Sequence, residues 1–502
     1  MSLWCEQPER TTFPHPTDEN RCIPKVDWTT LSAGLNHMEE NRSTTVNEYE
    51  RTPVPEPERK GWKSFLGMYA GEHTAGTEFM IGPLFLTAGV SAFDLIAGLI
   101  VGNFLAVLSW RYVCATVATE VRLTLYYKLE KICGRNLVTL YNLANGVLFC
   151  FLAGSMITVS ATAVGIPFDM EMPRLDDTLP NGPLWIIIVI VIGAVISLVA
   201  AGGYNAVSRF ANIASPWMVV IFMVCGIVAL MQLKVASFED FWNVWGKGSD
   251  PFPGQIKFTF WHVVFFAWFC NAAMHIGMAD MSVFRYAKSP SAGWMTASGM
   301  YIGHFMAWIS AALLYAVFLK SPEAVALLAN GEAPPVSPGP MAYDAVGVAG
   351  LIVVVVAGWT TANPTIYRAG LAFQAIAPKT STFTITLIAG AVATSAGIFP
   401  AFAMKLLGFV ATYGFILAPV GAIVVFDHYF SKKAGVKPDY AESQQLNFNF
   451  AVLFAWLLSM MIFYGIAEFY GIFLSFLTLP AWFASGILFL IFSRLLQNKR
   501  RS

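Results

Sequence analysis

Charged side chains are scarce in this sequence of 502 residues, since only 12% are Asp, Glu, Lys or Arg. So little charge, together with 56% hydrophobic residues and a mean hydropathy of +0.59, excludes an ordinary soluble globular protein. The formal net charge of zero identifies no partner by itself, and no nucleic-acid partner is expected. The composition therefore indicates a protein of the lipid bilayer, and the 40 Phe and 15 Trp fit the aromatic belts of such proteins.

Motifs of catalysis and metal binding are also missing. The sequence shows no nucleophile–base pair, no phosphate loop and no cluster of metal ligands, so an enzyme is not expected. Seven cysteines have neither CxxC nor Cys/His spacing, which favours small buried side chains over a disulfide framework or a metal centre. The sequence shows no filter-like loop, and this argues against a channel. No organic cofactor is expected.

Residues 1–61 lack an apolar core of signal-peptide length, and they are polar with seven prolines. They have too little apolar surface to offset the entropy lost on ordering. We therefore expect a largely disordered cytoplasmic tail, whose function the sequence does not reveal.

Hydropathy predicts an all-α membrane protein with about twelve spans. Their approximate limits are 64–89, 92–112, 138–165, 183–202, 207–233, 258–281, 294–319, 344–370, 383–400, 403–427, 448–469 and 475–495. Lys and Arg gather in alternate connections, for example Arg122 and Lys128 after the second span, and acids such as Glu171 and Glu332 lie in the others. This alternation predicts a multi-pass protein of the plasma (cell inner) membrane with both termini cytoplasmic.

Two of the predicted spans are interrupted by polar residues and glycine. In the first, the stretch from Gly71 to Glu78 divides two apolar pieces, and in the sixth the apolar residues 258–269 are followed by Asn271, His275 and Asp280. Such breaks at corresponding positions predict an inverted repeat of two five-helix halves over residues 62–430, as in LeuT-like transporters. Residues 431–502 would add two helices and a basic cytoplasmic end.

The eighth span changes character partway along its length. Residues 346–358 are apolar, and then Thr360, Thr361 and Asn363 bring polar groups to a depth where lipid-facing polarity is costly. One interpretation is that the hydroxyls bond back to carbonyls of their own helix. The other is that they face a neighbouring helix, water or an ion. An unwound backbone in the first and sixth spans would line the same cavity, because hydrocarbon cannot satisfy its polar groups.

Several short motifs resemble those of one transporter family. WTT at 359–361 and IYRAGLA at 366–372 are similar to its eighth helix, and LTAGVSAFDLIAGLIVGN at 86–103 is similar to its second. MADMSVFRYAKS at 278–289 and GFILAPVGAIVVFDHYF at 414–430 follow in the family's order. On these motifs the chain resembles the nucleobase:cation symporter-1 family, which includes cytosine, purine, allantoin and hydantoin permeases. The resemblance covers nearly all of residues 62–430.

The resemblance implies secondary active transport of a small, nitrogen-rich solute coupled to a cation. It implies a sodium site made of the hydroxyls of Thr360 and Thr361, the carbonyl of Ala357, and carbonyls around Thr77 and Ile81 in the break of the first span. Neutral oxygen ligands suit a small hard cation. Coupling to a proton is the alternative.

The resemblance also implies a substrate site between the third, sixth and eighth spans. The residues expected there are Glu78, Asn145, Phe149, Cys270, Asn271, His275 and Asn363. Phe149 stands where family members carry Trp, Gly146 where they carry Gln, and Ala362 where Asn usually follows the threonine pair.

Single residues leave further alternatives open. Glu78 would attract a cationic group of the substrate, pair with His275, carry a proton, or be a protonated structural residue. Asp280 and Arg285 would form a gate or a structural ion pair. A competing hypothesis is a transporter-like sensor that signals through residues 1–61, and another is a proton-coupled carrier of a different solute.

Overall fold

The structure is a computed structural model that describes residues 48–168, 170–173, 175 and 177–499. Most of the predicted cytoplasmic tail (residues 1–47) and Arg500 and Arg501 of the basic C-terminus lie outside the described residues. The described residues form one compact unit. Residues 48–61, which the sequence assigned to the tail, belong to this unit.

Regular structure in the described part of the chain is helical, apart from one isolated bridge between Lys60 and Ala287. The elements up to the middle of the chain are η1 (Glu56–Glu58), α2 (Lys63–His73), α3 (Glu78–Thr87), α4 (Ala92–Ser109), η2 (Trp110–Cys114), α5 (Ala115–Val121), α6 (Leu125–Cys133), α7 (Arg135–Val164), η3 (Ile166–Phe168), α8 (Pro183–Ala201), α9 (Gly203–Gln232) and α10 (Phe238–Asn243). Those that follow are α11 (Phe260–Phe269), α12 (Met281–Phe284), η4 (Pro290–Met295), η5 (Ser298–Ala307), α13 (Trp308–Phe318), α14 (Pro322–Ala329), α15 (Pro338–Val346), α16 (Val348–Ile376), α17 (Thr382–Gly397), α18 (Ala401–Met404), α19 (Leu406–Tyr429), α20 (Tyr440–Ser443), α21 (Phe450–Tyr470) and α22 (Leu474–Lys499).

Each predicted span coincides with helical structure. Within the described residues, nine stretches are long and apolar enough to cross a membrane, and three shorter apolar helices, α3, α11 and α17, fall on the remaining predicted spans. A helix rises 1.5 Å per residue, so the ten residues of α3 or of α11 reach only about half of the hydrocarbon thickness. The all-helical membrane fold is confirmed, and the count of twelve stays a prediction.

The breaks lie where the polar interruptions predicted them. In the first span α2 ends at His73, where the hydroxyl of Thr74 donates to the carbonyl of Ala70 at 2.6 Å, and α3 begins at Glu78. In the sixth span α11 ends at Phe269, and the chain then runs through turns, with a left-handed residue at Met278, until α12. Both breaks leave helix ends inside the protein.

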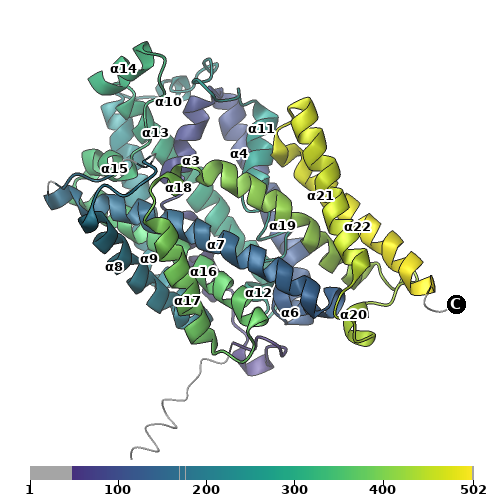
Figure 1. Ribbon diagram of the computed structural model, residues 1–502. Helices are drawn as coiled ribbons and strands as arrows, with labels where there is room; N and C mark the ends of the chain where they lie inside the picture. The colour runs from purple at the N-terminus through teal and green to yellow at the C-terminus, as the bar shows by residue number, and fades with distance from the viewer. Residues whose placement is uncertain (1–47, 169, 174, 176, 500–502) are drawn as a thin grey trace, which may run out of the picture. The chain divides into compact units, whose positions relative to one another are not determined.

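The helix contacts fall into two groups (Figure 1), which α9 joins because it packs on α2 and α13 of one group and on α16 of the other. In one group α7 packs along α16 and α17, and α17 packs on α8. In the other, α11 packs on α4, α2 on η5, and α3 on α13. The last two helices, α21 and α22, lie side by side at one edge, drawn in yellow, where α22 also packs on α19 and α11. The interrupted elements thus belong to one group and face α16 of the other.

Candidate substrate and ion site

A cavity of about 50 Å³ lies where the two interrupted spans meet α16. The first span contributes Glu72, His73, Thr77, Glu78 and Ile81 to its wall. The break after α11 contributes Cys270, Asn271 and Met274, and the wall is completed by Leu152, His304, Thr361, Thr365 and Tyr413. The half-helix ends and the polar face of α16 therefore converge at one place, as the sequence predicted.

Three of the five expected sodium ligands line this cavity, namely Thr77, Ile81 and Thr361. The hydroxyl of Thr361 donates across to the carbonyl of Glu72 at 2.9 Å, so α16 and the end of α2 meet through two oxygen atoms. The hydroxyl of Thr360 donates instead to the carbonyl of Ala357 in its own helix, at 2.9 Å. Of the two interpretations drawn from the sequence, bonding within the helix applies to Thr360, and contact with a neighbouring helix applies to Thr361.

Close backbone approach holds these groups together. A Cβ atom on Gly76, in the break, would lie 3.4 Å from the backbone nitrogen of Gly358 and 3.0 Å from the side chain of Val159. The oxygens on the two sides of this contact are neutral hydroxyl and carbonyl groups, the ligand type that suits sodium. The donor set present thus fits the expected cation, with Thr361 and the carbonyl of Glu72 as the residues that would hold it.

Among the seven expected substrate residues, Glu78, Cys270 and Asn271 line the cavity. The carboxylate of Glu78 accepts from the hydroxyl of Thr77 at 3.0 Å and from the indole nitrogen of Trp308. The amide nitrogen of Asn271 lies 3.4 Å from Nε2 of His304.

The other four are buried behind the cavity wall. Asn145 donates to the hydroxyl of Tyr126 at 3.2 Å, and Phe149 packs edge-on against Tyr413, with 5.5 Å between ring centroids. Their roles in binding stay predictions.

Asn363 and His275 also lie outside the wall. Neither amide atom of Asn363 has a hydrogen-bond partner within the described ranges. His275 is hydrogen-bonded through Nε2 to the carbonyl of Trp268 at 2.9 Å, so its expected pairing with Glu78 is not what the structure has.

Two histidines of the wall were not expected from the sequence. The rings of His73 and His304 lie 4.8 Å apart and edge to face, and Nδ1 of His73 is 2.9 Å from the carbonyl of Tyr69. His304 stacks on Trp308 with 4.1 Å between centroids. It lies in η5, a stretch of π-helix, a form found at functional sites. The signal available in the sequence was a histidine in the middle of an apolar span.

A buried ionic network adjoins the cavity. Arg368 donates to both carboxylate oxygens of Glu72, at 2.7 and 3.1 Å, and to Asp280 at 2.6 Å. The other oxygen of Asp280 accepts from Tyr69 and Trp110, each at 2.7 Å. The side chain of Arg368 is fully buried.

Arg285 is not the partner of Asp280, so the expected pair between these two residues is wrong. Its guanidinium lies 3.6 Å from the carboxylate of Glu48 and donates to the carbonyl of Tyr49 at 2.8 Å. The physical reason is that Asp280 is reached by Arg368 from α16, while Arg285 faces the segment that precedes the first span.

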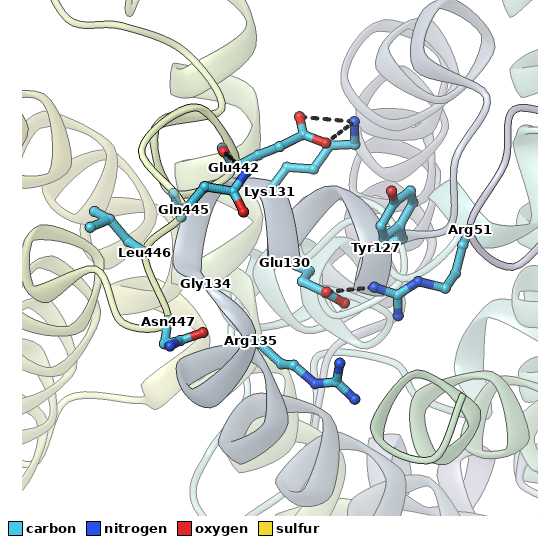
Figure 2. Close-up of a pocket in the computed structure, with 11 residues that line it drawn as sticks. Arg51, Tyr127, Glu130, Lys131, Gly134, Arg135, Glu442, Gln445, Leu446 and Asn447 are labelled. Carbon is cyan, nitrogen blue, oxygen red and sulfur yellow. Dashed lines mark hydrogen bonds and ion pairs between the residues drawn. The ribbon is translucent and has the colours of Figure 1, made fainter. Parts of the chain in front are cut away.

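A second cavity, of about 220 Å³, lies between α6, the start of α7 and the loop after α20 (Figure 2). Four of its charged residues form two pairs, Arg51 with Glu130 at 2.5 Å and Lys131 with Glu442 at 2.9 Å, and Arg135 is the fifth charged residue of the lining. The cavity includes no interrupted helix, and most of its charges are already paired, which leaves few groups for a ligand. The smaller, deeper cavity is therefore the candidate site.

Nearby α6 is anchored by Lys128, which lies 3.1 Å from Asp427 and 2.5 Å from Asp439. Burial lowers the pKa of Lys128, but the two carboxylates raise it by more, so its pKa lies above the ordinary value and the side chain stays charged. These ion pairs hold α6 against the core.

Two interrupted spans that meet a polar helix from the other group define the LeuT-like transporter fold. The solved structure of Mhp1, a nucleobase-cation-symport-1 family transporter in a closed conformation with bromovinylhydantoin bound, matches with a TM-score of 0.67 and 15% identity. The match covers 90% of this chain and 96% of that one. A Na⁺-coupled sialic acid symporter, in a substrate-bound outward-open state, matches with a TM-score of 0.60 and 12% identity over 93% and 97% of the two chains.

No protein-family model matches the sequence, and no curated protein matches it either. At these identities the similarity to the two symporters establishes the fold, which confirms the predicted all-α, LeuT-like class, while the inverted repeat of two five-helix halves stays a prediction.

Proposed function

We propose that this chain is a sodium-coupled secondary active transporter that takes up a small, nitrogen-rich solute, related to the nucleobase:cation symporter-1 family. The observation that carries the proposal is the hydrogen bond from Thr361 to the carbonyl of Glu72. It joins the end of an interrupted helix to a polar helix of the other group, beside the candidate cavity. The two symporters with this fold bind a hydantoin or are coupled to sodium, which supports both parts of the proposal.

Alternating access follows from how the site is divided. Glu78, Asn271 and His304 belong to the group that contains the interrupted spans, and Thr361 belongs to the group of α7, α8, α16 and α17. Rocking one group against the other opens the cavity to either side without moving the site itself. A solute of nucleobase size requires such opening, because ligand pockets usually enclose some 300 Å³ or more. A cation shared by the two groups favours the state that binds solute.

The proposal includes that the protein crosses the plasma membrane several times and has both termini in the cytoplasm. It also includes that the protein moves a small-molecule substrate without converting it chemically. Uptake into proteoliposomes tests it. Radiolabelled purines, pyrimidines and hydantoins are offered with an inward sodium gradient, an inward proton gradient, or neither. Accumulation driven by sodium supports the proposal, and accumulation driven only by protons replaces sodium with the proton.

A sensor is the second candidate, favoured by the packing of residues 48–61 on the transporter. The carboxylate of Glu48 is buried against Tyr286 and Tyr367, so this segment is physically linked to the core. Deleting residues 1–47 decides between the two functions. Unchanged uptake in the truncated protein argues against signalling as the main activity.

A further inference from the structure

The wall of the candidate cavity has more Glu side chains than Lys or Arg side chains among the described residues. It contains two carboxylates, Glu72 and Glu78, and within the described residues no Lys or Arg lines it. Glu72 is neutralised by Arg368 through two hydrogen bonds. Glu78 has no cationic partner in the described part of the chain, because its contacts are the hydroxyl of Thr77 and the indole of Trp308.

The carboxyl group of Glu78 is buried, so a charge on it requires a partner. Glu78 is 2% exposed and lies in an interrupted span, where an uncompensated charge is costly. Its position as first residue of α3 places it at a helix N-terminus, which favours an anion by only about 0.3–1 kcal/mol in ordinary cases. A carboxylate offers about four lone-pair sites, so two donors leave acceptor positions open toward the cavity.

A second observation points to a ligand. His304 is 2% exposed and lines the same wall, and its Nδ1 has no hydrogen-bond partner among the described residues. Asn271 lies next to it and presents an amide. The acceptor oxygens of Glu78 suit a group that carries N–H donors and positive charge, and the unpartnered Nδ1 of His304 offers one further polar contact to such a ligand.

We propose that the transported solute is an organic cation, with a protonated amine, an amidinium or a charged nitrogen heterocycle, and that Glu78 binds its charge. The inference rests on the proposed transport function and deepens it. A neutral solute would leave the carboxyl group of Glu78 without a cationic partner in the cavity, whereas a cation supplies the counter-charge that this wall lacks. The aromatic side chains of Trp308 and Tyr413 beside the site add quadrupoles that favour a cation.

Matched pairs of probes that differ in charge but little in shape test this inference. Benzamide and benzamidine form one pair, and nicotinamide and 1-methylnicotinamide form another. Purified protein in lipid nanodiscs is titrated with each probe, by thermal shift and by calorimetry, with and without sodium. Binding of one or both cations, with little or no binding of their neutral partners, is the expected result. Ligands that bind the folded form raise its melting temperature.

Substitution of Glu78 provides the second half of the test. Glu78→Gln keeps one acceptor oxygen for the indole of Trp308, and its amide NH2 can donate to the hydroxyl of Thr77, so we expect the protein to fold and to bind the cation at least about thirtyfold more weakly. Glu78→Asp keeps the charge and is expected to recover part of the affinity. Glu323→Gln, at an exposed glutamate of α14, is the matched control and is expected to bind as the wild type does.

Outcomes for this inference and for the transport function are separable. Binding of neutral probes alone, or cation binding that Glu78→Gln leaves unchanged, overturns the inference. A change in sodium affinity in Glu78→Gln with no change in preference for charged probes also overturns it, since Glu78 would then serve the coupling ion. If no cation binds while sodium still stabilises the protein and drives uptake of a neutral solute, only the substrate class is wrong. If sodium has no effect and no solute is taken up, the proposed function itself fails.

Discussion

Arg368 in α16 holds the carboxylate of Glu72 at the end of α2 through two parallel hydrogen bonds, at 2.7 and 3.1 Å. The geometry matches the planar fork of a guanidinium to the two oxygens of a carboxylate. The same Arg368 reaches Asp280 beyond the break of the sixth span. One side chain therefore ties both interrupted spans to the opposite helix group, just beside the cavity.

Removing that side chain leaves two buried carboxylates without a counter-charge. Arg368→Gln is expected to destabilise the protein by ~3–5 kcal/mol, because breaking a buried ion pair strands its partner. The measurement is the melting temperature of purified protein in detergent. Arg209→Gln, at an exposed arginine of α9, is the control.

The double variant Arg368→Gln with Asp280→Asn separates charge from packing. It removes one of the two stranded carboxylates and is expected to recover part of the lost melting temperature. Equal melting of Arg368→Gln and Arg209→Gln would mean that the network contributes nothing to stability.

Thr360 and Thr361 are neighbours with different partners, and this predicts different phenotypes. Thr361→Ala removes the oxygen that faces Glu72 and is expected to raise the sodium concentration for half-maximal stabilisation at least about tenfold. Thr360→Ala removes a bond within its own helix and is expected to have a smaller effect.

Sodium-induced shifts in melting temperature measure both effects without any knowledge of the solute. Thr361→Ser retains the hydroxyl and should preserve the response. Thr394→Ala, whose hydroxyl bonds to Gly390 within α17, is the remote control. A normal sodium response in Thr361→Ala would remove this residue from the ion site.

Hydropathy and polar interruptions were sufficient to predict where the helices lie and which two are broken. The interruption between Gly71 and Glu78 is unmistakable in an apolar span, and so are Thr360 and Thr361, the polar residues that end the apolar run of the eighth span. These features depend on the local sequence. They can be recognised because polar groups are costly in hydrocarbon and are therefore rare in apolar spans.

Which side chains reach the cavity was harder to predict. Successive residues of a helix point about 100° apart, so a small error in the expected rotation of a helix moves a side chain from the cavity wall to the packed interior. Asn145 and Asn363 are polar and at the right depth, yet they lie behind the wall. The partner of Arg368 depends on how helices distant in the chain pack together, and no spacing in the sequence encodes that. The π-helix that turns His304 inward is equally a product of tertiary packing.

Glycine in η5 allows α2 to approach closely. A Cβ atom on Gly303 would lie 2.5 Å from the carbonyl carbon of His73, and one on Gly299 would lie 2.6 Å from Nδ1 of the same residue. Gly303→Ala therefore forces the two helices apart and is expected to cost ~1–3 kcal/mol of stability and to reduce uptake.

Gly465→Ala is the matched control, because nothing lies within 4 Å of the added methyl group in α21. That change is expected to be neutral or stabilising by up to ~1 kcal/mol, since alanine favours a helix. Melting temperature and initial uptake rate are measured for both. If the two substitutions behave alike, close approach at η5 is not required.

The segment before the first span is fastened by one buried acid, Glu48. Its carboxylate accepts from Tyr367 at 2.7 Å, from Tyr286 at 2.8 Å and from the backbone nitrogen of Tyr204 at 2.9 Å, and it faces the buried Arg285. These partners come from three different parts of the core. The hydrogen bonds of Glu48 thus hold residues 48–61 against the core.

Glu48→Ala removes these hydrogen bonds and leaves the buried Arg285 without its carboxylate partner. We therefore expect a loss of ~3–5 kcal/mol in the free energy of unfolding and faster exchange of the backbone amides of residues 48–61. Hydrogen–deuterium exchange read by mass spectrometry measures the second effect. Glu56→Ala, in the same segment, is the control, since Glu56 is exposed and its pair with Arg59 is of the kind that contributes little. If exchange in residues 48–61 rises equally in both variants, the segment is held by something other than its buried carboxylate. If it rises only in Glu48→Ala, release of this segment depends on a single acid placed between α9, the end of α12 and α16.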